Sequence, residues 1–171
     1  MKKFILLILF IFLILPCLAE EVLYLDKKWD QEASRILYDY ALKKVNMSSK
    51  QAYEAFGYKL EDVRAVFYDL NSDGIGEVIG YINAPSSWCR EGMTLFILQK
   101  VNNNYNDDLG YFNFYPEKGI RILNTKTDGY YDFERYFTKI NFIEDSKEPL
   151  TYTYNFHSVA KYNKKYKWYN K

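Results

Sequence analysis

The sequence predicts an α+β fold: two N-terminal helices followed by an antiparallel β meander of about seven or eight strands, in a single domain. Three observations support this prediction. Apolar residues near the N-terminus recur at helical spacing, and the rest of the chain divides into short apolar segments separated by turn residues. One late segment alternates apolar and polar residues over its whole length, and no internal repeat or linker divides the chain.

Residues 1–19 have the composition of an export signal. Lys2 and Lys3 precede the apolar run FILLILFIFLIL, and small residues at Cys17 and Ala19 suit cleavage by a signal peptidase. The run is shorter than the roughly 20 residues that span a membrane. We therefore expect a periplasmic or secreted domain of residues 20–171 with no stable membrane span. Lipid attachment at Cys17 and an uncleaved N-terminal anchor are the alternatives.

The charge balance excludes broad classes of partner. The chain has 23 basic and 22 acidic residues, so loss of Lys2 and Lys3 with the signal leaves a net charge of about −1. Nucleic acids and anionic membranes attract proteins with a basic excess. We therefore expect no nucleic-acid partner.

The helices are predicted from periodicity and from capping residues. After a lead-in, residues 20–28, for which no structure is predicted, apolar residues from Ala33 to Val45 recur on one helical face and Asp30 suits the N-cap. A shorter helix follows, because Ser48 and Gln51 form a capping box and Gly57 is a typical stop.

The strands are predicted from apolar runs and from alternation. Runs at 63–70 and 77–83 flank an acidic loop, and the run at 93–101 is apolar on both faces, which is typical of a covered central strand. Further strands are expected at 109–115, 120–123 and 130–137. Residues 150–162 alternate with a period of two, and 166–170 closes a terminal hairpin.

The loop between the first two predicted strands resembles a calcium-binding loop. Acidic and amide side chains alternate before Gly74, as in the first half of an EF-hand, but Gly80 stands where the last glutamate belongs and a strand follows. The loop is therefore no EF-hand and is closer to the strand–loop–strand calcium loops of integrin-type repeats. The candidate ligands are Asp69, Asn71, Asp73, Ile75 (through its carbonyl) and Glu77.

Two interpretations of this loop stay open. Calcium favours such oxygen donors, and the expected affinity is the weak extracellular kind, a dissociation constant of roughly 10⁻⁴–10⁻³ M. Asp, Asn and Gly are equally what a metal-free β-turn requires, because their side chains bond neighbouring amides.

Other reactive or aromatic residues have structural explanations beside functional ones. Cys89 is alone after signal removal, and is either a buried apolar residue or a thiol for an intermolecular disulfide. His157 is expected at the surface, since one histidine builds no usual zinc site. The 18 Tyr, 12 Phe and 3 Trp either build the core or bind glycan or peptide. The candidate patch is Tyr162, Tyr166, Trp168 and Tyr169, with lysines among them that suit an acidic partner.

Three segments resemble an uncharacterised family of exported bacterial proteins. The family's D-L-N-G-D-G-x-x-E loop corresponds to residues 69–77, its W/Y-C-G-x-x-G-C-T turn to WCREGMT, and its G-W-x-D-L segment to residues 129–133. Met93 stands near the family's second turn cysteine. The resemblance therefore implies loss of a local disulfide and an unpaired Cys89. It also implies an envelope protein without established catalytic residues.

Together these features favour an exported cell-envelope protein with a binding or structural role, and the sequence points away from an enzyme without settling the matter. The expected partner is an envelope or secreted protein or a glycan. No glycine-rich phosphate loop and no common hydrolase motif occurs in the chain. The alternatives are a periplasmic hydrolase that uses a carboxylate pair, such as Asp69 or Glu77 with a distant acid, and an inhibitor of a wall-degrading enzyme.

Overall fold

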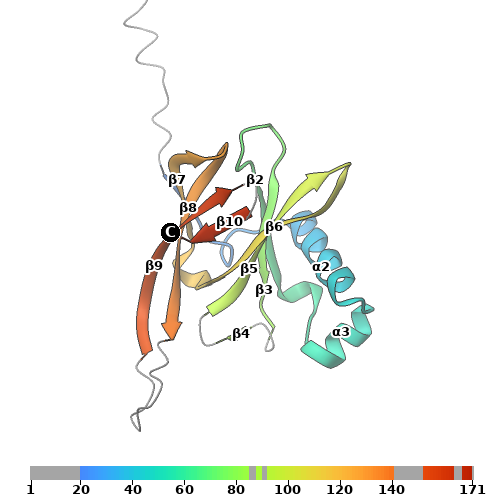
Figure 1. Ribbon diagram of the computed structural model, residues 1–171. Coiled ribbons are helices and arrows are strands. Elements are labelled where there is room, and N and C mark those ends of the chain that lie inside the picture. The colour runs from blue at the N-terminus through green and yellow to red at the C-terminus, as the bar shows by residue number, and fades with distance from the viewer. Residues whose placement is uncertain (1–19, 85–87, 90–91, 141–151, 164–166, 171) are drawn as a thin grey trace, which may run out of the picture.

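Two helices are followed by antiparallel strands in two sheets, and this arrangement confirms the predicted single α+β domain (Figure 1). The computed structural model describes residues 20–84, 88–89, 92–140, 152–163 and 167–170. The predicted export signal at residues 1–19, with Cys17, lies outside the described residues. Among the residues described, no helix is long and apolar enough to cross a membrane.

The first helix begins and ends at residues that the sequence marks. Helix α2 (Gln31–Val45) is capped by Asp30, whose side chain accepts a hydrogen bond from the backbone N–H of Ala33 at 2.8 Å. It ends at Asn46, which adopts a left-handed conformation with φ 54°. Asparagine tolerates this conformation better than most residues.

The second helix also follows its local signals. Helix α3 (Ser49–Phe56) begins with the predicted capping box: Ser48 and Gln51 each bond the other's backbone N–H. It ends at Gly57, where φ is 74°. A short 3₁₀ turn, η1 (Leu60–Asp62), then leads into the strands.

The middle layer of the molecule is a sheet that we call sheet B. Its strands follow the order β2–β3–β5–β4, and β6 also pairs with β5. They are β2 (Val63–Tyr68), β3 (Glu77–Ile82), β4 (Trp88–Cys89), β5 (Gly92–Val101) and β6 (Asn104–Phe114).

Strand β3 is buried along its whole length, because both faces of sheet B are covered. Its Gly80 lies opposite Ala65 of β2, and a Cβ atom at position 80 would lie only 2.4 Å from the Ala65 Cβ. Gly80 therefore permits the close approach of two strands. This role accounts for the residue that stands where an EF-hand would need its last glutamate.

The remaining strands form sheet A, in the order β1–β7–β8–β9–β10. The strand β1 (Glu21–Leu23) comes from the lead-in, for which the sequence predicted no structure. It pairs with β7, which is about a hundred residues further along the chain, and Val22 lies opposite Arg121. The other strands are β7 (Ile120–Thr127), β8 (Tyr130–Ile140), β9 (Tyr152–Asn163) and β10 (Lys167–Asn170), and the 3₁₀ turn η3 (Pro116–Lys118) precedes β7.

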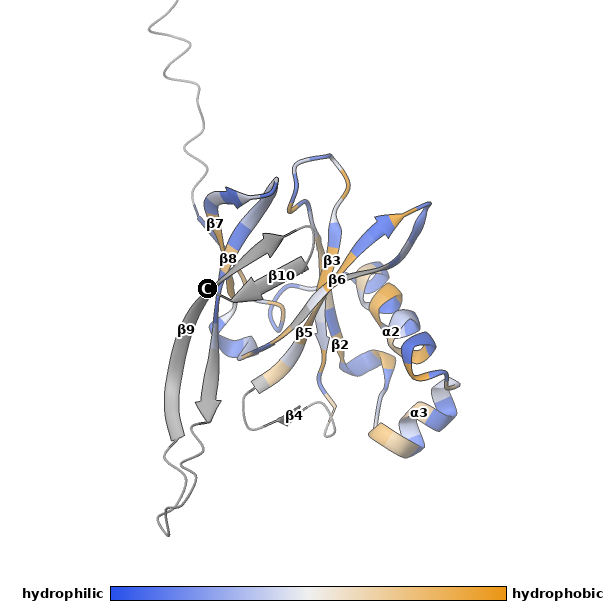
Figure 2. Cartoon of the chain, viewed as in Figure 1, coloured by the Kyte–Doolittle hydropathy of each residue, from blue (hydrophilic) through white to orange (hydrophobic). Residues whose placement is uncertain are grey.

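Two hydrophobic cores hold three layers together. One core lies between the two sheets and includes Leu23, Ile79 and Phe133. The other lies between α2 and sheet B and includes Leu37 and Val78. Accordingly, α2 carries both hydrophobic and hydrophilic residues in Figure 2, as expected of a helix with one face on a core. The predicted meander is thus divided into two packed sheets.

Candidate functional site

The acidic loop joins β2 to β3 at one end of sheet B (Figure 1). Its side chains bind its own backbone. The Asp69 carboxylate accepts hydrogen bonds from the N–H groups of Asp73 at 3.1 Å and Gly74 at 2.9 Å. Asp73 in turn accepts from the N–H of Ile75 at 2.8 Å. These bonds fix the sharp turn, which Gly74 completes with φ 85°.

Three of the predicted ligand residues converge on the inside of this turn. The side-chain oxygens of Asp69 and Asn71 both approach the backbone nitrogen of Asp73, at 3.1 and 2.9 Å. The Asn71 amide also donates to the second Asp73 carboxylate oxygen at 2.9 Å. The Asp69 and Asn71 oxygens therefore lie close together, and both accept the same backbone N–H.

Glu77, the last residue of the predicted ligand set, lies at the base of the loop, and its role as a ligand stays a prediction. Its side chain is only 2% exposed, and its carboxylate accepts the N–H of Leu70 at 2.8 Å. Burial raises the pKa of Glu77 to about 7. Its hydrogen bond to Leu70 opposes this rise, and the charges of Asp73 and Asp69 add to it. Glu77 therefore lies in the core beneath the loop, and its carboxylate holds the start of the loop through the Leu70 N–H.

The geometry of the loop fits a cation only in part. Asp69, Asn71 and Asp73 supply the oxygen chemistry that calcium prefers, and the Ile75 side chain is exposed at the tip. No group of three or more His, Cys, Asp or Glu side chains is arranged to hold a metal ion within the described part of the chain. The hydrogen bonds account for the turn without a metal, and calcium binding stays a prediction.

The loop also connects the two sheets. From β7, the Lys126 ammonium donates to Ser72 Oγ at 2.7 Å and to the Asn71 carbonyl at 3.3 Å. From β8, the N–H of Tyr131 donates to the Leu70 carbonyl at 2.7 Å. These contacts could not be predicted from the sequence, because Lys126 and Tyr131 lie far along the chain from the loop.

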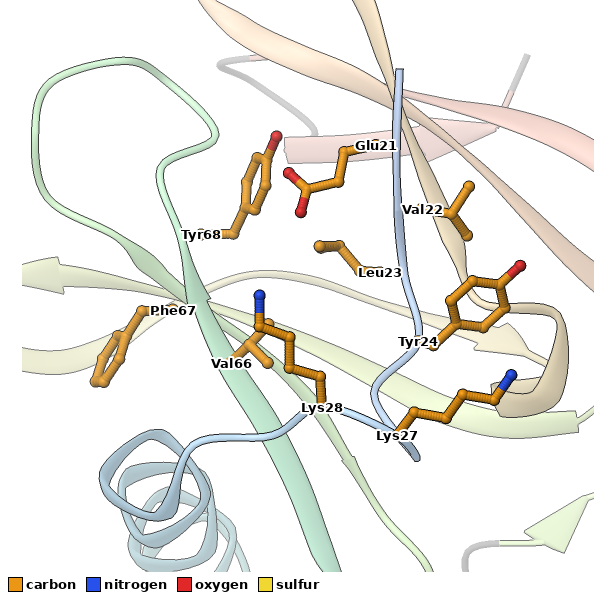
Figure 3. A pocket seen from close by; sticks show the side chains of 9 residues that line it. All are labelled: Glu21, Val22, Leu23, Tyr24, Lys27, Lys28, Val66, Phe67 and Tyr68. Atoms are coloured by element: carbon orange, nitrogen blue, oxygen red, sulfur yellow. The ribbon is translucent and has the colours of Figure 1, made fainter. Parts of the chain in front are cut away.

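A cleft of about 270 Å³ lies below the loop, between β1 of sheet A and β2 of sheet B (Figure 3). Leu23 and Val66 form apolar walls, and Tyr68 lies at its upper end next to Glu21. The hydroxyl of Tyr68 is hydrogen-bonded to the Glu21 carboxylate. Burial, and then this carboxylate, raise the Tyr68 pKa. The cleft could not be predicted from the sequence, because the lead-in that forms one wall carries no local signal of a strand.

The cleft bears on the hydrolase alternative. Of the described residues that line it, Glu21 is the only one with a carboxylate. Asp69 and Glu77 line no part of it, since the first caps the loop backbone and the second faces the core. The described cleft thus does not bring a carboxylate pair to one substrate.

For the remaining candidate residues, the structure describes the strand pairing of the backbone but not the side chains. Cys89 lies in β4 opposite Gly92, and His157 lies in β9 opposite Tyr136. In the predicted aromatic patch, Trp168 pairs with Tyr162 across β9 and β10, while Tyr166 lies outside the described residues. Their side chains also lie outside the described part, so the predictions for Cys89, His157 and the patch stay predictions.

The fold and the site define a class of protein: a three-layer α+β domain with a self-capped acidic loop and a cleft between two sheet edges. Comparison with known proteins adds no narrower identity. No family model, no curated protein and no solved structure matches the chain significantly. The resemblance to exported bacterial proteins therefore rests on the sequence motifs alone.

Proposed function

We propose that the chain is an exported, non-enzymatic binding domain of the bacterial cell envelope, and that calcium stabilises its loop between β2 and β3. The export signal supports the location, and the cleft between β1 and β2 supports a binding role. The observation that carries the calcium proposal is the approach of the Asp69 and Asn71 side-chain oxygens to one backbone nitrogen, that of Asp73, whose carboxylate lies beside the Asn71 amide.

Calcium at this position would act on the junction of the two sheets. The loop that it would brace already bonds to Lys126 and Tyr131 of sheet A. A cation would also reduce the repulsion between Asp69 and Asp73, since like charges at short range oppose each other. The stabilisation follows mass action and is about 2.7 kcal/mol when calcium stands at about 100 times its dissociation constant.

The test of the calcium proposal is a pair of charge-removing variants. Asp69→Asn and Asp73→Asn each remove a negative charge and keep one of the two acceptor oxygens that the carboxylate uses in the loop. The wild type should gain thermal stability on addition of 5–10 mM calcium, about the range that saturates a weak extracellular site. Both variants should lose most of that gain, and magnesium should substitute poorly. A wild-type melting temperature that calcium leaves unchanged would remove calcium from the proposal.

Export is tested separately by cell fractionation. The intact chain should appear in the periplasm or medium with its N-terminus near Glu20, and deletion of residues 2–15 should retain it inside the cell. N-terminal sequencing or mass spectrometry distinguishes cleavage after Ala19 from lipid attachment at Cys17. An unprocessed chain that stays in the cytoplasmic fraction would contradict the proposed location.

A further inference from the structure

The cleft between β1 and β2 offers an open strand edge. The N–H of Ala65 donates to Ser34 Oγ at 3.2 Å, and its carbonyl accepts the N–H of Asp30 at 2.7 Å. Both groups of Ala65 therefore point away from β3. Antiparallel strands alternate with a period of two, so the backbone N–H and C=O of Phe67 point the same way.

Phe67 lies beyond the cover that α2 provides. Asp30 and Ser34 satisfy the edge at Ala65, whereas no hydrogen bond to the Phe67 backbone edge occurs among the described residues. Phe67 also lines the cleft, and its side chain is 37% exposed. An unpaired strand edge at the rim of a cleft is suited to pairing with another extended backbone.

The cleft also carries an available positive charge. Figure 3 shows the Lys28 side chain, which lines the cleft, running upward past Val66 to its ammonium. None of the described residues forms an ion pair or hydrogen bond with it. The neighbouring Lys27 differs, because its ammonium lies over the Tyr24 ring at 4.5 Å from the ring centre.

The cleft is lined by one carboxylate, Glu21, and by two ammonium groups, those of Lys27 and Lys28, so positive charge is in excess. Glu21 accepts the hydroxyl of Tyr68 at the upper end, and no ion pair joins it to Lys28 in the described structure. An anionic group would therefore be drawn to the Lys28 side, between apolar walls. The volume of about 270 Å³ admits one or two apolar side chains and excludes a folded domain.

We propose that this cleft binds the C-terminal end of an extended apolar peptide. The peptide backbone would pair with the edge of β2 at Phe67, its last apolar side chain would lie between Leu23 and Val66, and its terminal carboxylate would meet Lys28. This inference rests on the proposed binding role and names its ligand class. A fatty carboxylate could use the walls and Lys28 but has no backbone to pair with Phe67, so the edge favours a peptide.

The test is an NMR titration of the purified protein with two matched probes. The first is an acetylated valine–threonine–leucine peptide with a free C-terminus, and the second is the same peptide as a C-terminal amide. The acid should bind at least about tenfold more tightly, because a hydrogen bond to a charged group is worth about 1.5–3 kcal/mol. The Phe67 and Leu23 backbone amides should show large shifts.

Two lysine variants give the matched control. Lys28→Met should remove the preference for the acid, whereas Lys27→Met should keep it, since Lys27 is directed onto Tyr24. Equal binding of acid and amide by the wild type, or no saturable binding, would overturn the proposal. Decanoate serves as the lipid probe. If decanoate binds more tightly than the peptide and leaves the Phe67 amide unshifted, the site belongs to a lipid carboxylate.

The titration is repeated with calcium and with a chelator. Peptide binding that persists in the chelator supports the cleft independently of the calcium loop. Loss of binding in both conditions, in a protein that fractionation shows to be exported, overturns the peptide site while leaving the proposed location intact.

Discussion

The Glu77 carboxylate accepts the backbone N–H of Leu70 at 2.8 Å and thereby joins the two ends of the acidic loop. Glu77 is the first residue of β3, and Leu70 follows β2 at the start of the loop. Both side chains are buried, so this bond lies in a region of low dielectric constant. The loop thus has a titrating group at its base.

The stability of the protein should fall as pH rises through the range in which Glu77 ionises. The folded pKa of about 7 lies above the ordinary value of 4.5, so the folded state binds more protons between these values. The contribution is fully present below about pH 4.5 and is lost by about pH 7, with an upper limit of about 3 kcal/mol. Urea unfolding at pH 5 and pH 8 measures it.

A glutamine variant separates this effect from other titrating groups. Glu77→Gln keeps an oxygen for the Leu70 N–H but does not ionise, so its unfolding free energy should depend less on pH than that of the wild type. Glu61→Gln, at an exposed position, is the control and should keep the wild-type profile. Parallel profiles for the wild type and Glu77→Gln would contradict the assignment.

The contact between Gly80 and Ala65 should tolerate no added methyl group. A Cβ at position 80 would lie 2.5 Å from the Arg64 carbonyl as well as 2.4 Å from Ala65, so Gly80→Ala should cost about 1–3 kcal/mol or more. Gly74→Ala is the comparison, since open space surrounds Gly74 and only its φ of 85° opposes the change. Gly80→Ala should be the more destabilising in urea unfolding, and the reverse order would contradict this packing.

The hydrogen bond from Ala65 to Ser34 should contribute measurably to stability. Ser34 is 2% exposed, and Ser34→Ala leaves the Ala65 N–H without its partner. We expect a cost of about 1–3 kcal/mol in unfolding free energy. Ser34→Thr, which retains a hydroxyl, should recover part of the loss. Wild-type stability in Ser34→Ala would show that the bond contributes nothing.

The contacts of Lys126 should slow local opening of the acidic loop. Lys126→Met removes the bonds to Ser72 and Asn71 while keeping an apolar stem near Tyr131, whose ring lies 4.1 Å from the ammonium. Global stability should fall by about 1 kcal/mol or less, because the pair is exposed. Amide hydrogen exchange at Asp73 and Gly74 should accelerate, whereas Lys118→Met should leave it unchanged.

The helices could be predicted from sequence because their signals are local. The box of Ser48 and Gln51 lies within one turn, and Asp30 caps the residues that directly follow it. The strand β1 could not be predicted, because three residues show no period and form a strand only by pairing with β7. The division into two sheets depends on similarly distant contacts.

Only the local part of the acidic loop could be predicted from the sequence. Adjacent spacing brought Asp69, Asn71 and Asp73 together, as the sequence suggested. Glu77 was placed with them by counting positions, but it belongs to β3, and the period of two puts it on the face of Ile79 and Tyr81, in the core between the sheets. That alternation was visible in the sequence and is the signal that predicts the burial of Glu77.

The pairing of β1 with β7 also sets an order of events during synthesis. Glu21–Leu23 are made before both helices, yet their partner Ile120–Ile122 emerges only after sheet B has been made. The earliest strand of the domain therefore stays unpaired until β7 has been made. Loop closure over such a separation is also slow relative to local folding. Since β1 supplies one wall of the cleft, a nascent chain has no finished pocket. Binding of the proposed ligand would thus report that β1 has paired with β7.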